Sequence, residues 1–106
     1  IELVPGAYEL PLACKWLFEA HKADAVIALG CVIKGDTDHD IYINNAVSSA
    51  LMNLSVQTQS PFVFGVITPN NYQQAKDRAG GKHGNKGVEC AVAVLKMLAL
   101  KDKLKK

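Results

Sequence analysis

The residues best suited to chemistry stand together between Asp36 and His39. They follow an almost unbroken apolar run, Ala25 to Ile33, of the kind that forms a strand buried on both faces. Lys34-Gly35 ends that run, and an apolar pattern at helical spacing begins after His39. The sequence therefore predicts a strand, a glycine turn and a helix start, with a titratable imidazole at the junction.

A junction of this kind favours an anionic ligand. In open α/β sheets, ligands bind at the carboxyl ends of parallel strands, and free backbone N–H groups at a helix start attract negative charge. An imidazole titrates close to neutral pH and therefore suits proton transfer. We predict a phosphate-handling active site with His39 as its acid–base group; the plainer alternative is a surface or capping histidine.

A second group of candidates surrounds the glycine- and lysine-rich segment 79–87. Three cations stand there among flexible glycines: Arg78, Lys82 and Lys86. A guanidinium group can hold phosphate in two places, and glycine lets the backbone approach a ligand. The segment lacks the G-x-x-x-x-G-K-[ST] spacing of a nucleotide triphosphatase. A solvated basic loop is an equally good interpretation of these residues alone.

Metal binding finds little support in the sequence. The segment Asp36 to Asp40 opens like a calcium loop, but the positions that need Gly and Glu are occupied by Ile41 and Val47. The other two histidines have no zinc-ligand spacing with His39. No glycine-flanked serine suggests a nucleophile elbow. We therefore expect no metal site.

Length and composition limit the possible classes of protein. A chain of 106 residues has room for one domain with one core, and a hydrophobic content of 49% is ordinary for a folded protein. A net charge of +2 does not argue for nucleic acid, and no apolar run is long enough to span a bilayer. The three cysteines include no C-x-x-C pair, which predicts reduced thiols in a cytoplasmic protein.

Strand and helix patterns alternate along the chain. Buried-strand patterns cover residues 1–4, 25–33 and 62–67, and helical spacing runs through residues 10–21, 37–56, 72–78 and 88–99. Consecutive strands joined by helices form βαβ units with parallel strands. The sequence therefore predicts the α/β class with a parallel sheet.

Four motifs occur in order along the chain, between residues 4 and 87. V-P-G-A-Y-E-L-P (4–11) and A-V-I-A-L-G-C-V-I-K-G-D-T-x-H (25–39) are the longest, followed by F-G-V-I-T (64–68) and D-R-A-G-G-K-H-G-N-K-G (77–87). With these motifs the chain resembles the 6,7-dimethyl-8-ribityllumazine synthase family. The resemblance implies a three-layer α/β/α sandwich with a flavodoxin-like, four-stranded parallel sheet.

The resemblance also implies a reaction. The family condenses 5-amino-6-(D-ribitylamino)uracil with 3,4-dihydroxy-2-butanone 4-phosphate, releasing phosphate and water, in riboflavin biosynthesis, without metal or organic cofactor. It implies that His39 is the acid–base group and that Arg78 binds the phosphate, together with the backbone at Asp36 and Thr37. The residues that would line the pyrimidine and ribityl pocket are Ala7, Tyr8, Glu9, Val32 and Ile33.

Assembly follows from the same resemblance. Phe64 and Lys86 match residues that a neighbouring subunit contributes, so the active site lies between subunits of a homo-oligomer. The family forms pentamers, which in some members build an icosahedral shell. No nucleic acid or membrane partner is expected.

Two departures from the family pattern stand out. Asp40-Ile41 occupies the place of an aromatic–acidic pair. The family's first strand and helix, which carry an aromatic residue that stacks on the pyrimidine, have no counterpart here, so we expect a single domain, 1–106, with a gap in its core. The alternatives are an archaeal-type riboflavin synthase, which shares the fold, and a non-catalytic flavin-binding or shell-forming relative.

Overall fold

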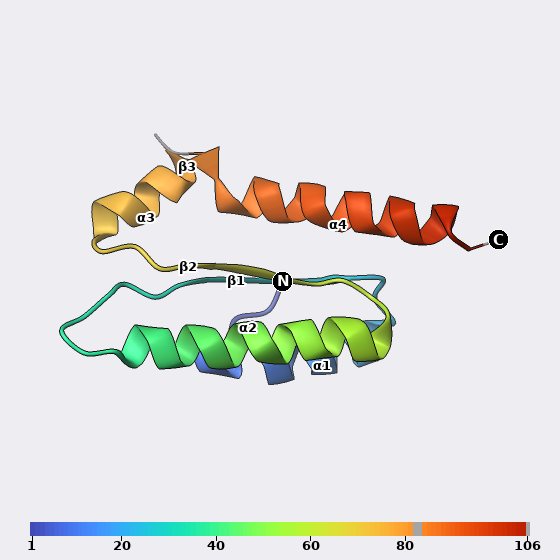
Figure 1. The fold of residues 1–106 in the computed structure, drawn as a ribbon, viewed down its shortest axis with the longest axis horizontal. Helices are drawn as coiled ribbons and strands as arrows, with labels where there is room; N and C mark the ends of the chain where they lie inside the picture. Colours follow the sequence, from blue (N-terminus) through green and yellow to red (C-terminus); the bar gives the residue numbers. More distant parts are fainter. Residues whose placement is uncertain (82–83, 106) are drawn as a thin grey trace.

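The computed structural model describes residues 1–81 and 84–105 and has three layers (Figure 1). A two-stranded parallel sheet of β1 (Val26–Cys31) and β2 (Phe62–Ile67) forms the middle layer. The register pairs Val26 with Phe62 and Cys31 with Ile67. Helices α1 (Leu10–His21) and α2 (His39–Thr58) cover one face of this sheet. The α/β class with a parallel sheet is thus confirmed.

The second face of the sheet carries the rest of the chain. Helix α3 (Tyr72–Arg78) follows β2, and a short antiparallel hairpin of β3 (Ala79–Gly81) and β4 (Gly84–Asn85) leads into α4 (Lys86–Lys103). A 3-10 turn, η1 (Ala7–Glu9), precedes α1. Both sheet strands run towards the end of the molecule that carries α3 and the start of α2 (Figure 1). No helix among the described residues is long and apolar enough to cross a membrane.

The predicted strand at residues 1–4 is wrong. These residues have no β pairing, and Ile1 and Leu3 are exposed. A strand exists only where its N–H and C=O groups find a partner, and the described residues offer none beside residues 1–4. Among the residues that the structure describes, β1 pairs only with β2, so its second edge is open.

The β3–β4 hairpin was not predicted, because three glycines and a short length give it no strand-like pattern. Gly80 and Gly84 have φ angles of 105° and 97°, which glycine adopts without steric cost. The hairpin turns the chain from α3 into α4. This turn brings the end of one helix beside the start of the next.

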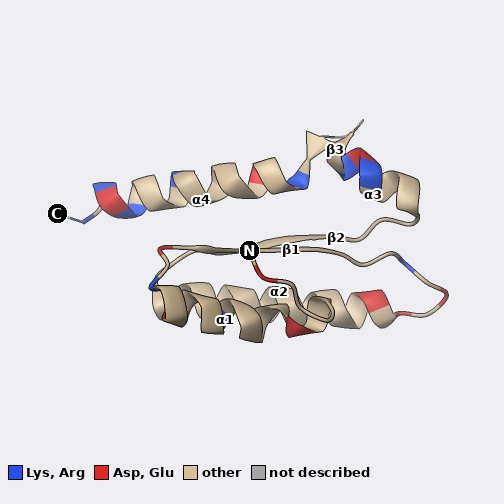
Figure 2. Cartoon of the chain, turned by 180° about the vertical axis from the view of Figure 1, so that it is seen from behind, with Lys and Arg blue, Asp and Glu red and all other residues tan. Residues whose placement is uncertain are grey.

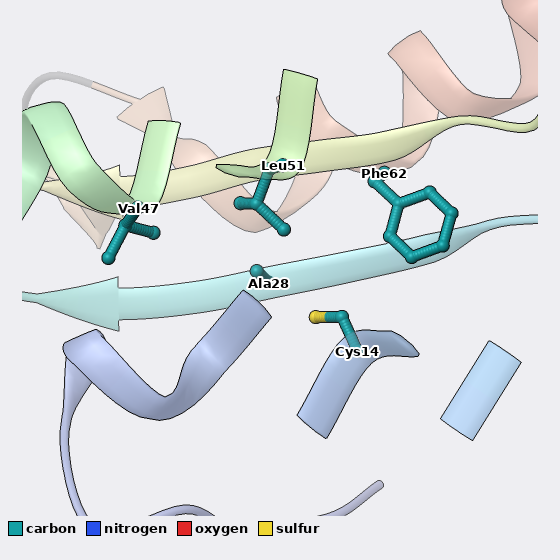
Figure 3. Close-up of a cluster of buried hydrophobic side chains, with 5 residues drawn as sticks. All are labelled: Cys14, Ala28, Val47, Leu51 and Phe62. Atoms are coloured by element: carbon teal, nitrogen blue, oxygen red, sulfur yellow. The ribbon is translucent and has the colours of Figure 1, made fainter. Parts of the chain in front are cut away.

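The core lies between the sheet and the α1–α2 layer (Figure 3). It consists of five buried side chains from both helices and both strands, Cys14, Ala28, Val47, Leu51 and Phe62. The rings of Phe18 and Phe62 lie 5.1 Å apart between centroids. Burial raises the pKa of the Cys14 thiol. This packed face holds α2, and with it His39, against the sheet.

The opposite face depends on a close approach at Gly65 of β2. A Cβ atom there would lie 2.8 Å from Cys90 Sγ of α4 and 2.9 Å from the Ala28 carbonyl oxygen. Any larger residue would force these elements apart. The missing side chain therefore lets α4 lie directly on the strands.

Candidate active site

The two strands stay joined beyond their assigned ends. The Val32 amide donates to the Ile67 carbonyl at 2.9 Å, and the Lys34 amide donates to the Pro69 carbonyl at 2.9 Å. The chain then leaves the sheet and enters α2 at His39. The strand–turn–helix arrangement predicted for this region is confirmed, with helix α2 shifted two residues along from its predicted span.

His39 occupies the first position of α2 and is exposed. Its backbone amide lies 3.4 Å from Thr37 Oγ1, whereas Asp38, in the capping position, makes no side-chain cap bond. The first backbone amide of α2 is therefore contacted by the side chain of Thr37 and not by that of Asp38. Asp40, one residue further, is buried.

A cavity of about 540 Å³ lies beside the end of β2. Its polar lining comprises Thr68, Gln74, Asp77, Arg78 and Lys86. Arg78 ends α3 and Lys86 begins α4, so the hairpin between them is what brings the two cations together. Such a pair, with a hydroxyl group nearby, is suited to an anion with several oxygen atoms.

Arg78 is held by an ion pair that sequence reasoning missed. Arg78 Nη2 lies 3.1 Å from Glu89 Oε1, in the first turn of α4, and the two side chains are 37% and 49% exposed. At this exposure the pair adds little to stability. Its effect is to orient the guanidinium group beside the cavity.

The remaining predicted site residues fall into separate places. Asp36 and Thr37 are exposed in the turn before α2, and Val32 and Ile33 follow β1 directly. Tyr8 and Glu9 are exposed on η1. Lys82 and His83 lie outside the described residues.

Three further hollows receive predicted site residues. One of about 640 Å³ brings Ile33 beside Arg78 and Lys86. Ala7 lines one of about 240 Å³ against Gly30 and Cys31 at the open edge of β1. Phe64 lines another of about 510 Å³ between β2 and the middle of α2. One copy of the chain therefore distributes the predicted site over several surfaces.

The start of α2 and helix α3 lie at the same end of the sheet but on opposite faces (Figure 1); His39 begins α2 and Arg78 ends α3. The cavity that Arg78 and Lys86 line does not include His39. Figure 2 shows acidic residues around the start of α2, whereas basic and acidic residues stand together around the end of α3 and the start of α4. Within one copy, the proton-transfer group and the cation pair are thus not assembled into one site.

Sequence reasoning also missed a side-chain contact between α2 and the end of β2. Asn44 Nδ2 donates to Thr68 Oγ1 at 2.6 Å. Thr68 gave a usable signal, because it directly follows the carboxyl end of a predicted strand, where ligands bind. Asn44 gave none, since one amide beside an apolar helix face has no distinctive spacing. Among the described residues, no cluster of His, Cys, Asp or Glu side chains has the arrangement that a metal ion needs.

Comparison with known families decides the evolutionary relationship. The family model described as 6,7-dimethyl-8-ribityllumazine synthase matches residues 1–102. The chain belongs to this family. The resemblance inferred from four motifs is thereby confirmed, while the roles of individual site residues stay predictions.

Individual lumazine synthases align closely with the chain. It is 53% identical over 96 residues to that of Cytophaga hutchinsonii, covering 91% of this chain and 60% of the relative. It is 50% identical over 100 residues to that of Porphyromonas gingivalis, covering 94% and 62%. With that of Phocaeicola vulgatus it shares 44% over 106 residues, covering 100% and 63%. The chain thus spans somewhat under two thirds of the length of these lumazine synthases.

Proposed function

We propose that this protein is a 6,7-dimethyl-8-ribityllumazine synthase. It condenses 5-amino-6-(D-ribitylamino)uracil with 3,4-dihydroxy-2-butanone 4-phosphate and releases phosphate and water. The main support is the family match over residues 1–102, combined with a cation-lined cavity at the carboxyl end of the sheet. A phosphorylated substrate needs such a cavity, and so does the phosphate that leaves.

The chemistry consists of proton transfers between positioned substrates. The uracil amine attacks the ketone carbonyl, and water leaves as the imine forms. Loss of the proton from the hydroxyl-bearing carbon then expels the phosphate and leaves an enol, which tautomerises to a second carbonyl group. Attack of the ribitylamino nitrogen on that carbonyl, with loss of a second water, closes the ring. His39 is the group that moves these protons, and Arg78 stabilises the phosphate as its bond to carbon breaks.

Substrate contacts complete the proposed site. The backbone at Asp36 and Thr37 supplies N–H groups for the phosphate near the start of α2. The pyrimidine and ribityl groups lie against Ala7, Tyr8, Glu9, Val32 and Ile33. Phe64 and Lys86 reach the same site from a neighbouring copy.

The site forms between copies of the chain. The support for this is that the start of α2, which carries His39, and the end of α3, which is Arg78, lie on opposite faces of one sheet (Figure 1). The acidic start of α2 and the mixed basic and acidic surface around the end of α3 suit a contact between unlike surfaces, which closes into a ring when repeated. We propose a pentamer, in line with the family, in the cytoplasm, where the three free cysteines remain reduced.

A further strand and helix complete the domain in this proposal. β1 has an open edge, and Ile27 and Leu29 on it are 37% and 56% exposed. A hollow of about 240 Å³ separates this edge from Leu3 and Val4. A strand inserted there would pair with β1 and give residues 1–4 the partner that they lack.

The test is a product assay with the full-length protein. Both substrates together should give the lumazine, with one phosphate released for each product molecule. Conversion of the lumazine alone into riboflavin would instead identify a riboflavin synthase. Tight riboflavin binding by an intact assembly, without product from either assay, would identify a non-catalytic relative.

A further inference from the structure

The contact between Asn44 and Thr68 connects the helix that carries His39 with the cavity that carries Arg78. Asn44 lies on α2 and Thr68 follows β2, and the donor–acceptor distance of 2.6 Å is short. Thr68 lines the cavity, whereas Asn44 is not among the lining residues. Asn44 can therefore influence a ligand in this cavity only through Thr68.

The backbone around Thr68 is already fixed without this contact. The carbonyl groups of its two neighbours, Ile67 and Pro69, accept hydrogen bonds from Val32 and Lys34 at 2.9 Å each. The hydrogen bond from Asn44 is therefore not needed to hold the backbone at Thr68 in place. What it determines is the state of the Thr68 hydroxyl group.

The direction of the bond decides how that hydroxyl group can be used. An amide nitrogen only donates, so Thr68 Oγ1 acts here as the acceptor and its own hydrogen is left over. Thr68 Oγ1 donates to no other group in the part of the chain that the structure describes. The hydrogen remains available to a ligand in the cavity beside Arg78 and Lys86.

Stability alone does not account for Asn44. Its Oδ1 atom is buried and has no hydrogen-bond partner among the described residues. A buried acceptor without a partner costs free energy, and an apolar residue at this position of α2 would avoid that cost. The Asn44 side chain thus donates a hydrogen bond to a cavity-lining hydroxyl group while its own Oδ1 atom lacks a partner among the described residues.

We propose that Asn44 is a positioning residue that makes Thr68 a third donor to the phosphate group bound by Arg78 and Lys86. This inference rests on the proposed function, in which the cavity binds the phosphorylated substrate. The family resemblance assigned no role to Asn44 or Thr68, and the proposal gives a role to both. The neutral hydroxyl would add a directional bond to two charged contacts.

Four variants of the full-length protein test the proposal. Thr68→Val keeps the shape but removes the hydroxyl, whereas Thr68→Ser keeps the hydroxyl. Asn44→Asp keeps the shape but can only accept, so it turns the Thr68 hydrogen away from the cavity. Asn45→Asp, at an exposed neighbouring position on α2, introduces the same charge without this contact.

The expected result is a selective loss of affinity for the phosphorylated substrate. Thr68→Val and Asn44→Asp should raise its KM on the order of tenfold, as expected for one lost hydrogen bond to a charged group. The KM for the uracil substrate should stay within about twofold, and Thr68→Ser and Asn45→Asp should resemble the parent. Because Thr68→Val changes no charge, agreement with Asn44→Asp separates hydrogen bonding from repulsion.

Binding of inorganic phosphate, measured by calorimetry, provides a readout that does not require turnover. Its dissociation constant should rise by a similar factor in Thr68→Val and Asn44→Asp. If the parent made no lumazine, the proposed function would fail, but these phosphate constants would still decide the role of Asn44. Equal losses for both substrates, or phosphate binding unchanged in both variants, would overturn the inference.

Discussion

At the scale of single residues, His39 can be removed without disturbing the core. It is exposed at the first turn of α2, and the five buried core residues lie elsewhere. We predict that His39→Ala lowers kcat by about 10²-fold, the lower end for general acid–base catalysis, since much of this reaction depends on positioning two substrates. Steady-state assays and thermal unfolding measure the two effects. His21→Ala, at the exposed end of α1, is the control; a matching loss there would contradict the assignment.

Removal of Arg78 should weaken ground-state binding of the butanone phosphate as well as stabilisation of the departing phosphate. Arg78→Ala removes the guanidinium group from the cavity and is expected to raise the KM of the butanone phosphate by about 10- to 100-fold, the range for a lost charge-assisted bond. Kinetics with each substrate varied in turn would show the selectivity. Lys103→Ala removes a cation at the far end of α4 and should change nothing. An unaltered KM in Arg78→Ala would refute its role in phosphate binding.

The Cys14 thiol gives the protein a sensitivity to alkaline pH. Burial raises its pKa above the ordinary value of 9.0, so the unfolded chain loses this proton at a lower pH than the folded chain. Above about pH 9 the unfolded state therefore binds fewer protons, and the free energy of unfolding falls as the pH rises. Urea unfolding between about pH 7 and 10 should show a smaller decline in Cys14→Ala. Cys31→Ala, which alters an exposed thiol, should keep the parent's decline.

At the scale of elements, the sequence predicted the helices and strands that are marked by a local pattern of apolar and capping residues. The strand at 62–67 and the helix at 72–78 have the bounds predicted for them, because apolar runs and capping residues mark both ends. Residues 1–4 have an equally apolar pattern but no partner. Pairing depends on another strand, which no local pattern can supply.

The candidate site was predictable to a similar degree. Local patterns in the sequence, strand ends and glycine turns, were enough to predict three parts of the site. These are the end of β1, the start of α2 and the cation pair. The Arg78–Glu89 and Asn44–Thr68 contacts join residues 11 and 24 positions apart, and only the folded chain brings them together. Tertiary contacts of polar side chains carry no periodic signal.

The close approach at Gly65 offers a test of how α4 packs on the sheet. Gly65→Ala would place a methyl group 2.7 Å from Leu29 Cδ2 and 2.8 Å from Cys90 Sγ. We predict a loss of about 1–3 kcal/mol in the free energy of unfolding, the usual range for an overpacked core. Gly35→Ala, where no atom lies within 4 Å of the added carbon, is the matched control and should be nearly neutral. Equal stability of the two variants in urea would show that α4 does not depend on this contact.

At the scale of the whole molecule, the exposed apolar side chains support assembly. On α2, Tyr42, Met52 and Val56 are 71%, 64% and 70% exposed, although the opposite side of this helix lines the core. α1 and α4 add Trp16 at 62% and Leu95 at 67%. Exposed apolar side chains of this kind support the proposed contact between copies of the chain. A helix with two apolar sides fits a position between its own sheet and a neighbouring copy.

If the site is shared between copies, mixing two impaired variants should restore activity, which a site within a single chain cannot do. In an assembly of His39→Ala and Arg78→Ala subunits, a site between copies can take Arg78 from the first variant and His39 from the second. Random mixing in equal amounts should restore both residues in about a quarter of the sites of a ring, because each partner is intact with a chance of about one half. The experiment is to unfold the two variants together, refold the mixture and compare its kcat with that of each variant refolded alone. Activity clearly above both variants is expected. If His39 and Arg78 acted within one copy, every site in the mixture would lack one of them, and activity would stay at the mean of the two variants.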